Sequence, residues 1–265
     1  MSAARPYRTP PVRHPWLYAL PGGSLPAEVI CRDEHFAWVE TFKHDFFAAT
    51  GLYRGPTGLA VLKINRTNPC FGIPMLWAGR FLGRREVKLY AAVHDLPGVP
   101  RLIGTIGQTG FLHAFVPGHP LERYEAVTDT FFDQLVTLVQ VLHRRHIAYV
   151  DLNKRQNILH GDDGRPYLID FQISLRLPPV GWRRVAAARW FLRRFQQGDY
   201  YHCLKHKRRL RPDLLTPAEK QIVERVGFWI RLHRLIARPL TQLRRRFLRS
   251  LQADETTPVA GSSAK

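Results

Sequence analysis

The chain of 265 residues is 45% hydrophobic and carries a formal net charge of +19. This length suffices for one two-lobed domain or two small ones, and the charge predicts an anionic partner such as a membrane surface, a nucleic acid or an acidic substrate. The wide spacing of Cys31, Cys70 and Cys203 argues against a zinc site or a disulfide framework and favours a reduced, cytoplasmic setting. No apolar run reaches the roughly 18 residues of a membrane-spanning helix, and prolines interrupt residues 1–28, where a signal peptide would need an apolar core.

Composition divides the chain into four parts. Residues 1–28 are rich in proline and are predicted to form an extended arm, whereas residues 29–117 carry the strand patterns of a first lobe. Residues 118–251 are predicted to form a helical second lobe with a strongly basic end. Residues 252–265 are small and polar, which predicts a disordered tail.

The first lobe is predicted to be a sheet with one helix. Apolar runs at 35–42 and 59–63 indicate strands, and the second run ends in Lys63. Residues 83–94 have apolar residues at helical spacing, and Glu86 is the acidic residue of that segment. Further apolar runs indicate two more strands, at 99–106 and 110–116.

The second lobe begins after a break in regular structure. Residues 115–121 contain two prolines and a glycine, which predicts a hinge. Residues 128–143 have an apolar stripe at helical spacing, which predicts a core helix. Apolar runs at 158–160 and 167–169 flank the sequence Gly-Asp-Asp-Gly, which predicts a β-hairpin. Three polar residues are thereby expected at one end of that hairpin: Asp151, Asn157 and Asp170.

This hairpin segment resembles the catalytic segment of the protein-kinase-like superfamily, whose loop reads H-R-D-L-x-x-x-N and whose metal-binding turn begins D-F-G. Asp151 and Asn157 match the loop, and Asp170 and Phe171 match the turn. The resemblance implies that Asp151 orients and deprotonates an acceptor hydroxyl, and that Asn157 and Asp170 hold Mg²⁺ on the phosphates of ATP. Lys154 takes the place of the loop lysine that contacts the transferred phosphate.

The same resemblance assigns roles in the first lobe. The strand that ends in Lys63 matches the V-A-I-K strand, whose lysine binds the α- and β-phosphates, and Glu86 is nominated as the partner of that lysine. A surface glutamate paired locally along the helix would explain the same residue without a function. Residues 43–58 occupy the place of the loop that covers the nucleotide, where Lys43 offers phosphate charge and glycines offer backbone freedom. An ordinary turn fits the same segment.

Several positions depart from the family pattern. Asp151 and Asn157 are one residue further apart than usual, and Tyr149 and Val150 replace the His and Arg before the aspartate. Gln172 replaces the glycine of the turn, and no A-P-E element follows. These departures exclude an ordinary eukaryotic-type protein kinase. They indicate a divergent bacterial branch, similar to lipopolysaccharide core kinases and RIO-type kinases.

Residues 182–249 contain 19 Lys or Arg against 4 Asp or Glu, with aromatic residues interspersed. Arg-rich amphipathic helices with aromatic residues are typical of an anionic membrane interface, so a membrane surface or an anionic glycolipid is the favoured partner. The same residues would also suit the core and solvated surface of the second lobe, and RNA phosphates are a third interpretation. Asp199 lies just before Lys205, His206 and Lys207 in a polar cluster that would suit an acceptor phosphate. The sequence does not indicate an oligomeric state.

These patterns together predict an α+β, two-lobed protein-kinase-like fold with a small β-rich N-terminal lobe and a helical C-terminal lobe. The expected function is that of an ATP- and Mg²⁺-dependent kinase acting on a hydroxyl group. The favoured acceptor is a sugar of a membrane glycolipid, reached by a peripheral protein from the cytoplasmic face of the inner membrane. Two alternatives remain open: a RIO-like protein serine/threonine kinase, and a catalytically weak pseudokinase scaffold at a membrane.

Overall fold

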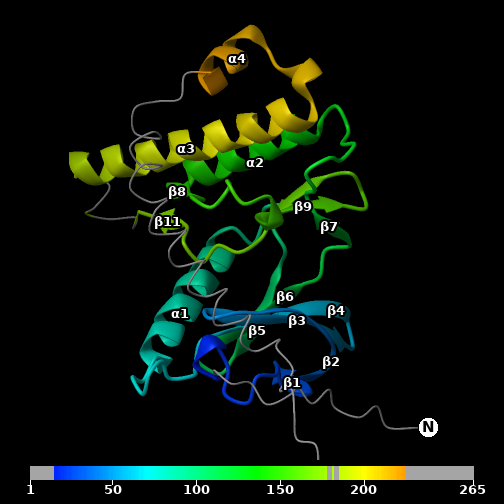
Figure 1. Ribbon diagram of the computed structural model, residues 1–265, viewed down its shortest axis with the longest axis vertical. Coiled ribbons are helices and arrows are strands. Elements are labelled where there is room, and N and C mark those ends of the chain that lie inside the picture. Colours follow the sequence, from blue (N-terminus) through cyan, green and yellow to red (C-terminus); the bar gives the residue numbers. More distant parts are fainter. Residues whose placement is uncertain (1–14, 178–180, 182–184, 225–265) are drawn as a thin grey trace, which may run out of the picture.

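The computed structural model describes residues 15–177, 181 and 185–224. They form a β-rich lobe with one long helix beside its sheet, and a helical lobe that also contains two small β-ladders (Figure 1). Within the described ranges the chain passes from one lobe to the other once, between Ala114 and Gly118. This is the α+β, two-lobed organisation predicted from the sequence.

The first lobe is built on a six-stranded antiparallel sheet with the strand order β1-β2-β3-β4-β6-β5. Alternating apolar residues place one face of this sheet in a core that includes Phe36, Tyr53, Leu62 and Leu112. The strands are β1 (Glu28–Cys31), β2 (Glu34–His44), β3 (Ala48–Gly55), β4 (Gly58–Asn65), β5 (Leu102–Ile106) and β6 (Gly110–Ala114).

Strand β3 occupies most of the segment 43–58, which was expected to be a nucleotide-covering loop. Gly51 and Gly55 lie within this strand, where added Cβ atoms would stand 2.8 Å from the backbone oxygen of Glu40 and 2.4 Å from the ring of Phe36, respectively. These glycines therefore permit close packing. They are not the flexible points of a loop, and only the short turn between β2 and β3 remains to cover a ligand.

Residues 15–27 pack onto the first lobe, although their prolines predicted an extended arm. A 3₁₀ turn at Pro15–Leu17 starts this segment, and Leu20 and Leu25 join the core beneath the sheet. The backbone oxygen of Ala19 accepts hydrogen bonds from the connection that follows β4. Apolar residues between the prolines thus fix this part of the arm, while residues 1–14 lie outside the described part of the chain.

Helix α1 (Leu76–Ala92) packs beside the sheet and begins seven residues earlier than the predicted start at 83. Gly79 permits its close approach, because a Cβ atom there would lie 1.9 Å from the backbone oxygen of Arg66. The face turned to the sheet buries Glu86, Leu89 and Tyr90. This packing places a carboxylate inside the lobe, next to strand β4.

The second lobe combines helices with short strands. Helix α2 buries the predicted apolar stripe of Phe131, Leu135, Leu138 and Leu142. The predicted hairpin is formed by β9 and β10, and β7 extends it to the order β10-β9-β7, while β8 pairs with β11. The helices are α2 (Phe131–Arg144), α3 (Ala186–Leu210) and α4 (Pro217–Glu224), and the strands are β7 (Gly118–Pro120), β8 (Ile147–Ala148), β9 (Ile158–Gly161), β10 (Pro166–Leu168) and β11 (Leu175–Arg176).

The two halves of helix α3, which belongs to the basic region, differ in burial. Its second half is core, because Tyr201, Cys203 and Leu204 are buried in the second lobe, which α2 helps to form. Its first half exposes Trp190 and Phe191. The remainder of the basic region, from residue 225, lies outside the described residues, as does the predicted tail. Within the described ranges no helix is long and apolar enough to cross a membrane.

Candidate active site

The hairpin of β9 and β10 gathers the predicted catalytic-loop residues. Asp151 Oδ2 accepts hydrogen bonds from Lys154 Nζ at 2.6 Å and from Asn157 Nδ2 at 3.1 Å. The backbone N–H of Ile169 donates to the oxygen of Asn157, which places Asp170 beside that loop. The additional residue between Asp151 and Asn157 is accommodated by a 3₁₀ turn at Arg155–Asn157. The loop is therefore closed around Asp151 despite its extra length.

Lys63 links the two lobes. Its ammonium lies 2.8 Å from Glu86 Oε1 on α1 and 2.8 Å from Asp170 Oδ1 in the second lobe. Glu86 is completely buried, and the side chain of Lys63 is only 10% exposed. The nominated Lys63–Glu86 pair is thus present in the structure. Burial opposes the charge of Lys63, but the two carboxylates outweigh it and raise the pKa of the ammonium above its usual value.

The two carboxylates beside Lys63 respond differently to burial. For Asp170, burial raises the pKa, but the ammonium of Lys63 outweighs this and the pKa is lowered. For Glu86, burial is stronger than the attraction of Lys63, and it raises the pKa to about 7. The negative charge of Asp170 adds to this rise. Of the two carboxylates, Asp170 is therefore the one that is firmly ionised, which is the state that binds a metal ion.

The raised pKa of Glu86 predicts a pH-dependent stability. The folded protein retains a proton on Glu86 that the unfolded chain releases near pH 4.5. The free energy of unfolding should therefore fall as the pH rises from about 4.5 to about 7, by at most about 1.4 kcal/mol per pH unit. Urea unfolding of the wild type and of Glu86→Gln across this range measures it, because the glutamine variant lacks this titration. Parallel curves for the two proteins would contradict the assignment.

Asp199 of α3 holds the backbone of the catalytic loop. Its carboxylate accepts the backbone N–H groups of Tyr149 and Val150, each at 2.7 Å, and also contacts His143 Nε2 at 3.1 Å. It is 1% exposed. The sequence interpretation of Asp199 as part of a site for an acceptor phosphate is therefore wrong, because both of its oxygens are engaged inside the lobe.

The basic residues that follow Asp199 also have structural partners. Lys205 Nζ donates to Asn153 Oδ1 at 2.7 Å, and His206 Nε2 donates to the backbone oxygen of Leu152 at 2.9 Å. Burial lowers the pKa of His206 to about 4, so this imidazole is neutral near pH 7. Lys207 is buried and pairs with Glu219 at 3.1 Å. Through Lys205 and His206, helix α3 thus forms hydrogen bonds with the loop that follows Asp151.

Three aromatic rings connect α1 to the catalytic loop. The ring of Phe171 lies 5.1 Å from that of Tyr90 on α1 and 5.2 Å from that of Tyr149, with both pairs close to edge-to-face. The hydroxyl of Tyr149 also donates to the backbone oxygen of Ile169. Tyr149 therefore connects the segment before Asp151 to the turn that carries Asp170.

The turn between β2 and β3 is anchored by Arg66, a residue that the sequence patterns did not single out. The guanidinium donates to the backbone oxygens of Trp16, Phe46 and Pro69 at 2.8 to 2.9 Å, and it lies over the ring of Phe46. Lys43, nominated as a phosphate ligand, has a 67% exposed side chain that pairs with Asp45 at 2.7 Å. The turn is therefore fixed to the first lobe by Arg66. Lys43 pairs with Asp45 and is not part of the group formed by Lys63, Glu86 and Asp170.

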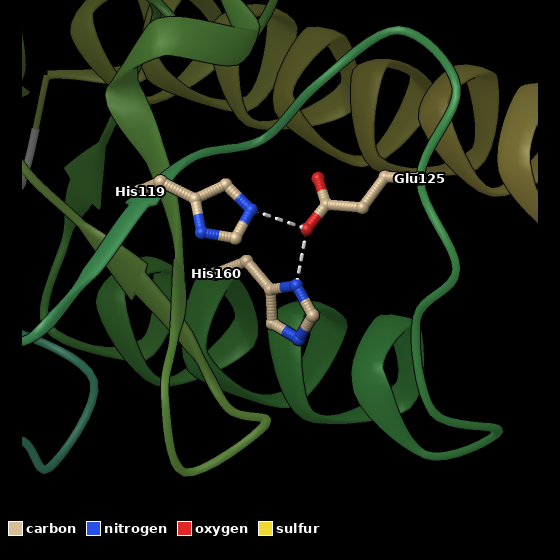
Figure 2. A group of neighbouring side chains, drawn as sticks. All are labelled: His119, Glu125 and His160. Atoms are coloured by element: carbon tan, nitrogen blue, oxygen red, sulfur yellow. Dashed lines mark hydrogen bonds and ion pairs between the residues drawn. The ribbon is translucent and has the colours of Figure 1, made fainter.

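A second polar cluster joins the hinge segment to the hairpin. Glu125 Oε1 accepts hydrogen bonds from His119 Nε2, at 2.8 Å, and from His160 Nδ1, so that one carboxylate oxygen faces both rings (Figure 2). The other oxygen of Glu125 accepts the backbone N–H of Glu122. Zn²⁺ accepts such a set of two imidazoles and a carboxylate, but here both oxygens of Glu125 already accept hydrogen bonds from protein groups. The cluster braces β7 against β9.

The donor set at Asn157 and Asp170 fits Mg²⁺. The amide nitrogen of Asn157 faces Asp151, which turns its carbonyl oxygen away from that residue. Lys63 contacts Oδ1 of Asp170, so a metal ion bound by this carboxylate would lie beside the ammonium. Oxygen atoms from an amide and an ionised carboxylate are ligands that Mg²⁺ prefers. These two residues would hold the ion against the phosphates of a nucleotide.

The two lobes, with Lys63 and Glu86 in one and Asp170 in the other, have the α+β, two-lobed organisation that the sequence predicted. No family model matches the sequence, and no curated protein matches it either. Solved structures with a similar chain path include the Rio2 kinase from Chaetomium thermophilum, with a TM-score of 0.48 and 16% identity over 72% of this chain and 64% of that one. A Rio2 kinase–ADP/Mg²⁺–phosphoaspartate complex from the same organism has a TM-score of 0.49 and 17% identity over 72% of this chain and 62% of that one.

The chain therefore spans less than two thirds of the length of these two structures. At this TM-score and identity the likeness carries no information on activity.

Proposed function

We propose that the protein is an ATP- and Mg²⁺-dependent phosphotransferase that acts on a hydroxyl group. One observation carries the proposal: the buried Lys63–Glu86 pair of one lobe meets Asp170 of the other, beside the loop that holds Asp151 and Asn157. A lysine for phosphates, two oxygen ligands for Mg²⁺ and a carboxylate for the acceptor are the parts that phosphoryl transfer requires. Pairing of Lys63 across the lobes supports a site that lies between them.

Each residue has a distinct part in the proposed reaction. Lys63 binds the phosphates, and Glu86 keeps its ammonium in place from within α1. Asp151 accepts a hydrogen bond from the acceptor hydroxyl and orients it in line with the transferred phosphate. Lys154, already 2.6 Å from Asp151, neutralises charge on the phosphate during transfer. Mg²⁺ held by Asn157 and Asp170 would neutralise the charge that the phosphate oxygens share.

The connection between the lobes offers a place for the nucleotide base. It follows β6 at residues 115–117, and the backbone N–H of Phe115 donates a hydrogen bond to the backbone oxygen of Leu59. The N–H of Val116 forms no hydrogen bond within the described part of the chain. His113, at the end of β6, is buried and stacks on Tyr90, so it closes the back of this region. An adenine edge would satisfy the exposed backbone of the connection.

The favoured acceptor is a sugar hydroxyl of a membrane glycolipid. The net charge of +19 supports an anionic acceptor or an anionic surface that presents it. The long helix α3, whose first half exposes Trp190 and Phe191, supports a membrane rather than a small soluble acceptor. A hydroxyl on a protein is the second candidate acceptor, and the experiment below separates the two.

The test is the transfer of label from γ-labelled ATP, with Mg²⁺, into a cell extract that is then divided into lipid, protein and nucleic-acid fractions. Label is expected in the lipid fraction, and Asp151→Ala should lower it on the order of a hundredfold or more, because it removes the proton acceptor. Asp162→Ala, which changes an exposed carboxylate in the turn of the same hairpin, serves as the matched control.

Label in protein that depends on Asp151 would replace the glycolipid by a protein acceptor. Absence of Asp151-dependent label in every fraction would overturn the proposed transfer. A shift of the melting temperature by Mg-ATP in that case would identify a nucleotide-binding scaffold without chemistry.

A further inference from the structure

The outer face of helix α1 combines basic and aromatic residues in one stripe. Trp77, Arg80, Phe81, Arg84 and Lys88 follow at spacings of three and four residues, so they share one side of the helix. Trp77 is 66% exposed and Phe81 is 60% exposed, although large aromatic side chains are usually buried. Glu86 lies on the opposite, buried face. We call these five residues the α1 stripe.

The α1 stripe forms one wall of a cavity. This cavity has a volume of about 880 Å³, and its other wall is the segment 174–176, which contains strand β11. Leu89 and Leu175 add apolar surface, while Arg85 and Arg176 add positive charge. No acidic residue lines the cavity. The cavity lies on the outer side of α1, away from the Lys63–Glu86 pair.

The charges of this cavity are not balanced by the described part of the chain. Arg85 Nη2 donates to the backbone oxygen of Ser174 at 2.5 Å, which closes the base of the cavity. Arg80 Nε is buried and has no hydrogen-bond partner among the described residues, which is costly for a guanidinium nitrogen. An anionic group in the cavity would satisfy Arg80 and offset the repulsion among the neighbouring cations.

We propose that the α1 stripe docks on an anionic phospholipid surface, with lipid phosphates held by Arg80, Arg84 and Lys88 and with Trp77 and Phe81 at headgroup depth. Charge complementarity selects an anionic partner. Exposed aromatic residues beside the arginines select a membrane, because such rings are favourable at the level of the headgroups. An acidic peptide would match the charges but would leave these aromatic rings in water.

The apolar exposure extends beyond the stripe. Phe71 and Ile73, in the connection just before α1, are 70% and 62% exposed. Helix α3 starts at Ala186, at the same left-hand side of Figure 1 as α1. Its first half exposes Trp190 and Phe191. Arg189 and Arg193 line a second cavity beside Trp190.

The first experiment measures insertion of Trp77 directly. Full-length protein is mixed with vesicles of equal parts phosphatidylcholine and phosphatidylglycerol whose acyl chains carry bromine, which quenches tryptophan at short range. Quenching is expected for the wild type and should be clearly smaller for Trp77→Phe. This comparison isolates α1 from the other basic parts of the chain, because only the fluorescence of Trp77 is removed.

The second experiment measures affinity by co-sedimentation with the same vesicles. Each basic residue near an anionic surface contributes about a fivefold change in affinity, so a variant with Arg80, Arg84 and Lys88 each replaced by serine should bind on the order of 100-fold more weakly. The matched control changes Arg123 and Tyr124, an exposed cation–aromatic pair in the second lobe, to serine and alanine. Pure phosphatidylcholine vesicles should bind the wild type weakly.

Equal quenching of the wild type and Trp77→Phe would overturn the proposal, and so would equal affinities of the triple-serine and control variants. A third outcome would assign the stripe to an acidic protein instead. In that case the triple-serine variant would bind a soluble polyglutamate peptide more weakly than the wild type does, and vesicles would not quench Trp77. Neither experiment depends on phosphoryl transfer, so a negative result here leaves the proposed function standing.

Discussion

Replacement of Asp199 by alanine is expected to lower the free energy of unfolding by about 3 to 6 kcal/mol. This buried carboxylate accepts two backbone N–H groups at 2.7 Å, and each hydrogen bond to a charged group is worth about 1.5 to 3 kcal/mol. Urea unfolding measures the loss. Asp199→Asn should be nearly as unstable, because its NH₂ group would face one of the two N–H donors.

A second measurement separates a local role from general stability. Hydrogen exchange at the amides of Tyr149 and Val150 should accelerate in Asp199→Ala by more than exchange in the distant six-stranded sheet. Asp213→Asn, which removes an exposed carboxylate just after the same helix, should change neither quantity appreciably. A loss below about 1 kcal/mol in Asp199→Ala would show that the loop does not depend on this contact.

The conformation of Val150 explains why the loop needs this anchor. Val150 has a φ of 72°, a region that a β-branched side chain rarely adopts, and such strain costs on the order of 1–3 kcal/mol. The hydrogen bond from its N–H to Asp199 holds the backbone in place. Asp170, with a φ of 62°, is held similarly by its ion pair with Lys63. Val150 precedes Asp151 and the other position is Asp170 itself, so these backbone conformations lie at the two carboxylates that we propose for catalysis and metal binding.

The local parts of the site could be predicted from the sequence. The apolar runs around Gly-Asp-Asp-Gly are sufficient for a hairpin, and that hairpin places Asn157 just before its first strand and Asp170 just after its second. Glu86 could be nominated because it is the acidic residue of a short helical segment that follows the strand of Lys63. In each case the decisive information lies within a few tens of residues.

The anchoring parts of the site could not be predicted in the same way. Asp199 lies 50 and 49 residues from its two backbone partners, and it is embedded in a basic, weakly periodic segment. Arg66 bonds to backbone oxygens, which leave no trace in residue types. Gly51 and Gly55 were interpreted as loop glycines, because glycine that permits close packing and glycine that permits a turn look identical in a sequence.

Loss of the charge at Lys63 is the other change with a large expected effect. Lys63→Met should lower the free energy of unfolding by about 3 to 5 kcal/mol, since it leaves Glu86 buried without a cation. Destabilisation should grow with pH, because the pKa of Glu86, already about 7, would rise further without the ammonium. Urea unfolding below and above neutral pH checks both statements.

A double-mutant cycle with Glu86→Gln tests whether the pair acts as a unit. Glu86→Gln in the Lys63→Met background should restore part of the lost stability, because no buried carboxylate then remains on α1. The melting-temperature shift caused by Mg-ATP should remain small in both variants that lack Lys63, since the phosphates lose their ligand whether or not the fold recovers. Additive effects of the two substitutions, or a full Mg-ATP shift without Lys63, would refute the role given to this lysine. In the double variant, stability should partly recover while Mg-ATP binding should not. This difference distinguishes a lysine that binds phosphate from a lysine that only completes a buried ion pair.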